Sequence, residues 1–270
     1  MPNLLDLLKE PEPLLKILNW CPSGRGKSWL AATFPSPLYF FDFDGRIQSV
    51  LPVAIKRNKK IDFDSYLAAD PTSYDRAFKK LEELIHAKPF PYKTVVCDTL
   101  TSLGDISMAR GMPTAQKFYG HRRPTINVPG VMQPVEVPVM QDHQTSGALI
   151  SKFVNTFYIL PCHVILNAHE AEDKDGITNK IFKNVAVTGK QSIKIPGIFS
   201  ELWRMEMEIK AGPDGKNKEY HRVITRPDHL YSARSCYADA LAEFEEADFD
   251  VIYPKITSWI AAKRKELGIS

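Results

Sequence analysis

The sequence has few cysteines and no long apolar run. The four cysteines stand singly at positions 21, 97, 162 and 236 without a CxxC pair, which argues against a disulfide framework and against a zinc site. No uncharged apolar stretch is long enough to cross a bilayer. The first residues, MPNLLDLLKE, carry acids within their leucines and lack the basic start of a secretory signal. We therefore expect a cytoplasmic protein without a membrane partner.

The sequence also lacks a strong net charge. Its 35 Lys and Arg residues nearly balance 32 Asp and Glu residues, for a formal charge of +3, so any surface for nucleic acid must be a local patch. The chain of 270 residues is 44% hydrophobic, which is enough for one large domain with a sizeable core.

Short apolar runs alternate with segments of helical spacing. This alternation predicts an α/β fold with a mainly parallel sheet, with strands at 14–20, 38–43, 94–97 and 163–168 and helices from 28, over 73–87 and over 147–160. From about residue 177 the pattern changes. We expect strands at 177–188, 202–211 and 220–225 as an antiparallel extension of the same sheet, followed by a helical tail over 237–270.

The segment CPSGRGKS, residues 21–28, comes directly after the first strand and directly before a helix. Glycines at 24 and 26 let the backbone wrap a phosphate closely with its N–H groups pointing inward. In such a loop Lys27 reaches the β- and γ-phosphates and the Ser28 hydroxyl binds Mg²⁺. Cys21 stands where the usual pattern opens with glycine. We assign the nucleotide to Pro22, Ser23, Gly24, Arg25, Gly26, Lys27, Ser28 and Trp29.

Carboxylates follow the next two strands. Asp98 ends the strand TVVC, where a carboxylate that holds Mg²⁺ together with Ser28 belongs; it could instead only cap the helix that begins at Thr99. Asp44 is our first choice for the general base and Asp42 the second, although both could simply be polar residues of a strand-end turn.

The strand HVILNA ends in Asn167, His169 and Glu170. Because ligands of parallel α/β sheets bind outside the carboxyl ends of strands, we expect His169 to lie near the γ-phosphate and to sense it. The alternatives are a structural histidine, or Glu170 as the base. No second histidine follows at helical spacing, so this is not a zinc motif.

These motifs occur in an order that resembles the phage RecA-like ATPases of the single-strand-annealing and recombinase type. The resemblance includes PSGxGKS, the strand ending in D-x-D, VVCDTLTSL and ILNAHE, and extends to VTGKQSIKIPGIFSELWRM and VITRPDHLYSAR. It covers most of the chain, roughly 14–256. The chain departs from the family at Cys21 and at Asp44, where the family usually has glutamate.

The resemblance implies a RecA-like core over 1–270 that uses ATP and Mg²⁺, in the host cytoplasm if the protein is viral. This single domain would include an N-terminal segment 1–13, an insertion loop 110–140 and the helical tail. The resemblance also implies rings or filaments, single-stranded DNA as a partner and possible contact with a single-strand-binding protein. A neighbouring subunit could then complete the nucleotide site with Lys190, Lys194 or Arg204, unless these are ordinary surface residues.

Residues 106–135 contain no acid, while basic and aromatic side chains are interleaved there. Cations beside aromatic faces are what single-strand binding without sequence preference requires. The alternative is a lid or a subunit contact without nucleic acid. The predicted DNA-binding residues are Arg110, Lys117, Phe118, Tyr119, Arg122 and Arg123.

Two other functions remain open at this point. A small-molecule kinase with the same loop would use Arg122 and Arg123 in a lid. A nucleotide-gated scaffold without turnover would explain Cys21 and Asp44. The length of the basic segment and the C-terminal strands favour an ATPase that acts on DNA.

Overall fold

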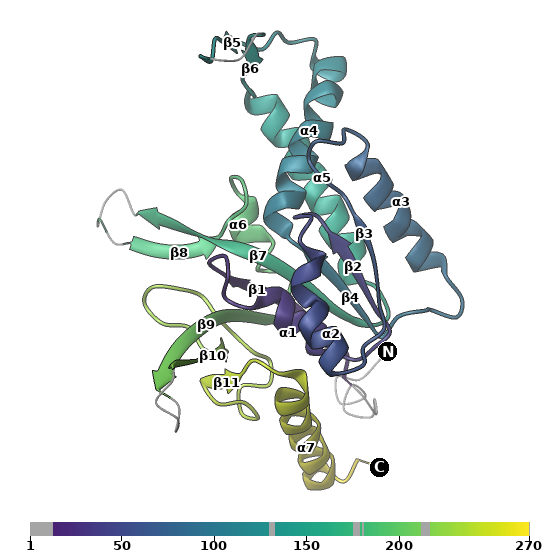
Figure 1. Ribbon diagram of the computed structural model, residues 1–270, viewed down its shortest axis with the longest axis vertical. Helices are drawn as coiled ribbons and strands as arrows, with labels where there is room; N and C mark the ends of the chain where they lie inside the picture. The colour runs from purple at the N-terminus through teal and green to yellow at the C-terminus, as the bar shows by residue number, and fades with distance from the viewer. Residues whose placement is uncertain (1–12, 130–132, 175–178, 180, 212–216, 270) are drawn as a thin grey trace.

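The computed structural model describes residues 13–129, 133–174, 179, 181–211 and 217–269. Within these residues nine strands form one sheet, with the order β11-β10-β9-β1-β7-β4-β2-β3 and β8 paired to β7. Figure 1 shows the sheet running through the molecule with helices on both sides. The strands are β1 (Lys16–Cys21), β2 (Leu38–Asp42), β3 (Ile61–Ser65), β4 (Thr94–Asp98), β7 (His163–Lys174), β8 (Ile181–Val185), β9 (Glu201–Ala211), β10 (Asn217–Ile224) and β11 (Phe244–Glu246).

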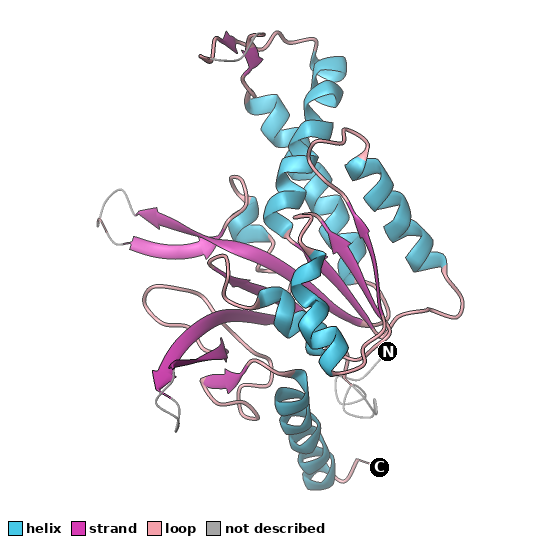
Figure 2. Ribbon diagram, viewed as in Figure 1, coloured by secondary structure: helices cyan, strands magenta, loops and turns pink. Residues whose placement is uncertain are grey.

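Helices cover both faces of the sheet (Figure 2). One face packs under α3, α4 and α5, and the other under α1, α2 and α7. The helices are α1 (Lys27–Thr33), α2 (Leu51–Lys56), α3 (Ser73–His86), α4 (Leu100–Tyr119), α5 (Met140–Tyr158), α6 (Gln191–Lys194) and α7 (Phe249–Leu267), with a 3₁₀ turn, η2 (Ile47–Val50). None of the helices in the described part of the chain is long and apolar enough to cross a membrane.

The apolar run of β1 explains its central place in the sheet. Leu18 and Trp20 enter the core under α3–α5, while Ile17 and Cys21 enter the core under α1 and α7. Side chains alternate between the two faces of a strand, so a strand buried on both faces must be apolar at nearly every position. Because β1 is packed on both faces, the position of the first residue of the following loop is fixed.

The expected mainly parallel α/β sheet, with helices on both faces and antiparallel strands toward the C-terminus, is confirmed. β1, β2, β3, β4, β7 and β9 are joined by parallel pairs, whereas β10 and β11 extend the sheet in antiparallel fashion. The strand at 202–211 was expected to be antiparallel to the sheet, which is wrong for its pairing with β1. β9 is parallel to β1 and antiparallel only to β10.

Three other expectations need correction. The edge strand β3 was not predicted, because only Ile61 and Phe63 break its polar sequence. The helical tail begins at Phe249 and not at 237, since Asp248 caps α7 by accepting a hydrogen bond from the Asp250 N–H at 3.0 Å. The acidic stretch before it forms β11. Of the predicted N-terminal segment, all but Pro13 lies outside the described residues.

The segment 110–140 is not a loop throughout. Its first part continues α4 to Tyr119, and α5 begins at Met140. Between them lies a small hairpin, β5 (Thr125–Ile126) with β6 (Val135–Glu136). Figure 1 shows this hairpin at the far end of α4 and α5, away from the sheet. We refer to residues 117–129 and 133–136 as the tip.

Candidate functional site

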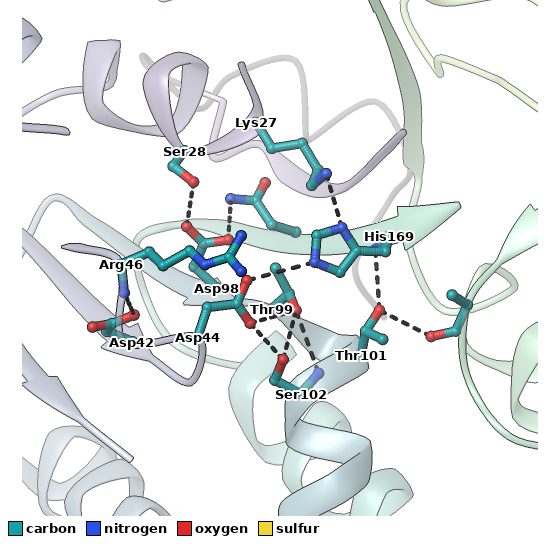
Figure 3. Close-up of polar contacts among 12 residues, drawn as sticks. Lys27, Ser28, Asp42, Asp44, Arg46, Asp98, Thr99, Thr101, Ser102 and His169 are labelled. Atoms are coloured by element: carbon teal, nitrogen blue, oxygen red, sulfur yellow. Dashed lines mark hydrogen bonds and ion pairs between the residues drawn. The ribbon is translucent and has the colours of Figure 1, made fainter. Parts of the chain in front are cut away.

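Four neighbouring parallel strands, β2, β4, β7 and β1, end at one edge of the sheet, and residues at or just beyond their ends line a common cavity of about 370 Å³. Figure 3 shows the polar contacts at the floor of this site. The cavity is lined by Ser23, Gly24, Gly26, Lys27, Ser28, Trp29, Asp44, Arg46, Ser49, Asp98, Thr99, His169, Glu219 and His221.

The predicted Mg²⁺ ligands lie next to each other. The Ser28 hydroxyl donates a hydrogen bond of 2.5 Å to Oδ2 of Asp98, which ends β4 (Figure 3). Hydroxyl and carboxylate oxygens are the ligands that Mg²⁺ takes in proteins, usually few in number and completed by water and phosphate. The pair therefore fits a Mg²⁺ ion that bridges the loop and the strand end.

Asp98 is held from the interior of the sheet. Nδ2 of Asn167, on β7, donates to Oδ1 of Asp98 at 3.2 Å, and Nδ2 of the buried Asn19, on β1, donates to Oδ1 of Asn167 at 3.0 Å. Burial raises the pKa of the Asp98 carboxyl, while the hydrogen bond from Ser28 opposes the shift. A bound cation would offset the cost of keeping this carboxylate charged.

Lys27 lies at the centre of the site and is buried. Its ammonium group donates to the carbonyl oxygens of Cys21 and Pro22, each at 3.0 Å, and lies 3.3 Å from Nδ1 of His169 (Figure 3). These partners hold the ammonium group inside the loop. The same group is within the cavity, where an anion could replace its carbonyl contacts.

His169 connects Lys27 to Asp44. Because Nδ1 faces an ammonium donor, the ring proton lies on Nε2, which is 3.5 Å from Oδ2 of Asp44. Oδ1 of Asp44 accepts from the hydroxyls of Thr99 at 3.1 Å and Ser102 at 2.5 Å. Burial raises the pKa of Asp44, but the hydrogen bonds from His169 and Ser102 outweigh it and lower the pKa to about 2. Asp44 is therefore a firmly ionised hydrogen-bond acceptor.

Some predicted residues do not join the cavity. Asp42 instead accepts from the backbone N–H of Arg46 at 3.1 Å and from the Ser65 hydroxyl at 2.8 Å, so it fixes the turn after β2. Pro22 and Arg25 border a separate hollow of about 170 Å³ behind the loop. The structure thus separates these three residues from Asp44, Asp98 and His169.

Three basic residues were predicted to complete the nucleotide site of a neighbouring subunit, and they differ in whether they are already paired within their own chain. Arg204 is held within its own chain, where its guanidinium group lies 2.9 Å from Glu170 and over the Tyr231 ring. Glu170 also pairs with Lys183 at 2.9 Å, so it is not placed to act as a base. Lys190 and Lys194 are exposed at α6.

The predicted DNA-binding residues separate into two groups. Phe118 and Tyr119 are 80% and 60% exposed, and Lys117 and Arg122 are exposed beside them. Arg110 is paired with Asp75 at 2.8 Å.

Arg123, like Arg110, is paired with acidic side chains. Its side chain is only 2% exposed and binds Asp142 and Glu136, each at 2.9 Å. It holds the base of the tip together and does not face solvent, so the prediction that it contacts DNA does not fit this geometry.

Sequence reasoning missed five residues that line the cavity. Three of them, Arg46, Ser49 and Thr99, are polar residues near strand ends. Polarity alone did not indicate that they line the cavity. Glu219 and His221 come from β10, almost two hundred residues beyond the phosphate loop. Only the pairing of β10 with β9, which in turn pairs with β1, brings them to the site.

No cluster of three or more His, Cys, Asp or Glu side chains able to hold a metal occurs among the described residues. The four cysteines are free thiols, three of them buried.

A family model described as an AAA domain matches residues 14–237. The matched region includes the phosphate loop and the ends of β2, β4 and β7. No curated protein matches the chain significantly.

Proposed function

Because the chain belongs to the AAA domain family, it is a nucleotide-binding ATPase domain of the P-loop class, and we propose that it couples ATP hydrolysis to the binding of single-stranded DNA. The observation that carries the nucleotide part is the contact of 2.5 Å between Ser28 and Asp98 beside Lys27, within one cavity. This contact supports the proposal because Ser28 and Asp98 would hold Mg²⁺ beside the loop that would bind the phosphates.

The loop residues bind and orient the phosphates. Lys27 exchanges the carbonyls of Cys21 and Pro22 for phosphate oxygens, and the glycine backbone lets N–H groups approach the same oxygens. Ser28 and Asp98 would hold Mg²⁺, which supplies charge neutralisation on the phosphates when bound.

Asp44 would orient the attacking water, and His169 would sense the bound phosphate. With a pKa of about 2, Asp44 is a weak base, so its part is to accept a hydrogen bond from the water and orient it. When Lys27 moves to the phosphates, Nδ1 of His169 loses its partner. His169 then reports the occupancy of the site to Asp44.

The tip supports the DNA part of the proposal. Lys117 and Arg122 supply exposed cations beside the exposed rings of Phe118 and Tyr119. Single strands bind such surfaces through phosphate neutralisation and base stacking. The tip is joined to the catalytic edge by α4, whose first turn carries Ser102, a partner of Asp44.

Assembly of several copies, as in RecA-like rings or filaments of phage recombination, is part of the same proposal. A neighbour's Lys190 or Lys194 could then approach the phosphates, since both are exposed. Arg204 is a poorer candidate because Glu170 already binds it.

The test is a steady-state phosphate-release assay with and without an oligonucleotide. We expect Lys27→Ala to abolish release, and single-stranded DNA to stimulate the unmodified protein. The double variant Lys117→Ala, Arg122→Ala should keep basal release and lose the stimulation. A pair that removes the same charge, Lys79→Ala on α3 and Lys88→Ala just after it, both exposed, should keep both properties. Absence of DNA retention at low salt with ATP present contradicts the DNA part.

A second function is favoured by one observation. Both oxygens of Asp44 already have partners, which leaves little capacity to activate water. A nucleotide-gated scaffold would bind ATP tightly and release no phosphate even with DNA. The same assay, combined with a binding measurement, separates the two functions.

A further inference from the structure

The nucleotide cavity has two chemically different halves. One half is the phosphate loop with Lys27, Ser28 and Asp98, and it accounts for a polyphosphate and its metal. The other half is formed by Trp29, Glu219 and His221, and the phosphates give it no role. A volume of about 370 Å³ is within the range of pockets that take small organic ligands.

Strand β10 supplies two of these side chains by simple alternation. Glu219 and His221 are two positions apart on a strand, so both project from the same face of β10. The register places His221 opposite Met207 and Glu219 opposite Ile209 on β9. Because β9 is itself paired with β1, this face of β10 lies over the loop that follows β1.

His221 is fixed against the loop by several contacts. Its Nδ1 lies 3.1 Å from the carbonyl oxygen of Arg25, and its ring is stacked on Trp29 with centroids 6.0 Å apart and planes inclined by 27°. The ring also packs so closely on Gly26 that a Cβ there would lie 2.9 Å from Nδ1.

The tautomer of His221 follows from its partner. A carbonyl oxygen only accepts, so Nδ1 carries the proton and Nε2 of the neutral ring is an acceptor. The Glu219 carboxylate, which is exposed at the rim of the same cavity, likewise only accepts. β10 thus presents two acceptors beside a stacked aromatic pair.

We propose that Glu219 and His221 form the nucleoside subsite of this cavity and select a purine nucleotide that carries an amino group. Contacts with Trp29 and Gly26 hold the His221 ring in place, and the two acceptors match the N–H donors of an aminopurine edge. This inference rests on the proposed nucleotide binding at the phosphate loop. It adds recognition of the base, which the loop does not contact.

The experiment compares ligands that share the phosphates and differ in the nucleoside. Equilibrium binding is measured by calorimetry for Mg·ADP, for Mg·purine riboside diphosphate, which lacks the amino group, and for Mg·pyrophosphate. The variants are Glu219→Ala, which removes the acceptor, and His221→Phe, which keeps a ring on Trp29 and Gly26. The matched control is Glu246→Ala, on the exposed face of the neighbouring strand β11 and outside the cavity.

We expect the unmodified protein to bind Mg·ADP at least about tenfold more tightly than either other ligand, as one or two hydrogen bonds would give. Each β10 variant should lose about three- to tenfold in affinity for Mg·ADP and none for Mg·pyrophosphate. The control should bind all three ligands as the unmodified protein does.

Three outcomes overturn the proposal, and they differ. If Mg·ADP affinity is unchanged in both variants, β10 does not contact the nucleoside. If Mg·ADP and Mg·pyrophosphate weaken together, Glu219 and His221 only shape the loop. If the unmodified protein binds neither Mg·ADP nor Mg·pyrophosphate, the nucleotide-binding function itself fails. Retained pyrophosphate binding also shows that a variant is folded.

Discussion

At the scale of single residues, Gly26 combines two constraints. Its φ of +91° belongs to the left-handed region that favours glycine, and an added Cβ would meet the His221 ring at 2.9 Å. We expect Gly26→Ala to lower the free energy of unfolding by about 2 kcal/mol, from backbone strain and from displacement of the ring. Urea denaturation measures this change.

Gly24 provides the control. Its φ is +76°, yet nothing lies within 4 Å of a Cβ built there, so Gly24→Ala carries the backbone term alone. We expect Gly26→Ala to cost more than Gly24→Ala, and the excess to vanish when His221→Ala is added. Equal costs in the two single variants would show that the ring yields freely.

The sequence could predict which loop residues line the cavity because they are close together in the chain. Gly24, Gly26, Lys27 and Ser28 are consecutive in one motif, and Asp98 is recognisable at the end of an apolar strand. Asp44 and His169 follow the ends of neighbouring strands, so the sequence could also place them near Lys27, whereas Ser102, the partner of Asp44 in the first turn of α4, was not predicted. Glu219 could not be found in this way, because no local pattern distinguishes a strand that crosses the loop from one that does not.

At the scale of elements, the base of the tip depends on an ion pair. The carboxylate of Asp142 is fully buried at the start of α5 and accepts from Arg123 and from the backbone N–H of Val139 at 2.9 Å. Arg123→Met leaves this carboxylate without its cation. We expect the opening free energy of residues 135–145, measured by hydrogen exchange, to fall by about 2 kcal/mol.

The neighbouring Arg122 is exposed and serves as the control. Arg122→Met should leave exchange at the tip unchanged while it weakens DNA retention. If Arg123→Met instead leaves exchange unchanged, the ion pair does not hold the tip together.

His163 joins the beginnings of β1 and β7. Its Nδ1 accepts from the Leu15 backbone N–H at 3.1 Å, and its ring lies among the rings of Phe34, Phe249 and Tyr253. Burial, with a contribution from the charge of Lys16, lowers the pKa of His163 to about 4. The unfolded chain binds the proton at a higher pH than the folded protein, so the stabilisation is complete above pH 6.5 and is lost as the pH falls toward 4.

We therefore expect the protein to lose stability between pH 7 and pH 5, with about 2 kcal/mol of that loss due to His163. His163→Asn keeps an acceptor for Leu15 and removes the titration. The variant should be less stable at pH 7, because a ring is lost from the core, but should show a smaller fall toward pH 5. Urea denaturation at both pH values measures the difference, and parallel curves would contradict the assignment.

The sequence predicted the strands that consist mainly of apolar residues. It did not predict the features that depend on how strands pair with one another. β1, β4 and β7 are buried on both faces and appear as continuous apolar runs. The edge strand β3 is half polar, since Asp62 and Asp64 accept hydrogen bonds from Tyr92 and Tyr39 and are not buried as a core would require. The direction of β9 could not be read from its own residues, because parallel and antiparallel partners bury the same side chains.

At the scale of the whole molecule, ligand binding should stabilise the fold. The cavity draws on β1, β2, β4, β7 and β10, so a bound nucleotide joins most of the sheet. Mg·ADP at one hundred times its Kd would add about 2.7 kcal/mol, which corresponds to a rise in Tm of roughly 5–10 °C. We expect EDTA to remove most of this rise and Lys27→Ala to abolish it in a thermal melt. The same rise in the Lys27→Ala variant would place the nucleotide elsewhere.

The central place of β1 has a consequence for synthesis of the chain. β1 leaves the ribosome before the parallel partners that cover its two edges, β7 and β9, which are encoded well over a hundred codons later. At elongation rates of about 5–20 residues per second, both edges of this strand stay unpaired for roughly 7–30 s. The nascent polypeptide is then a natural client for chaperones, and pairing of β1 becomes a late step of folding.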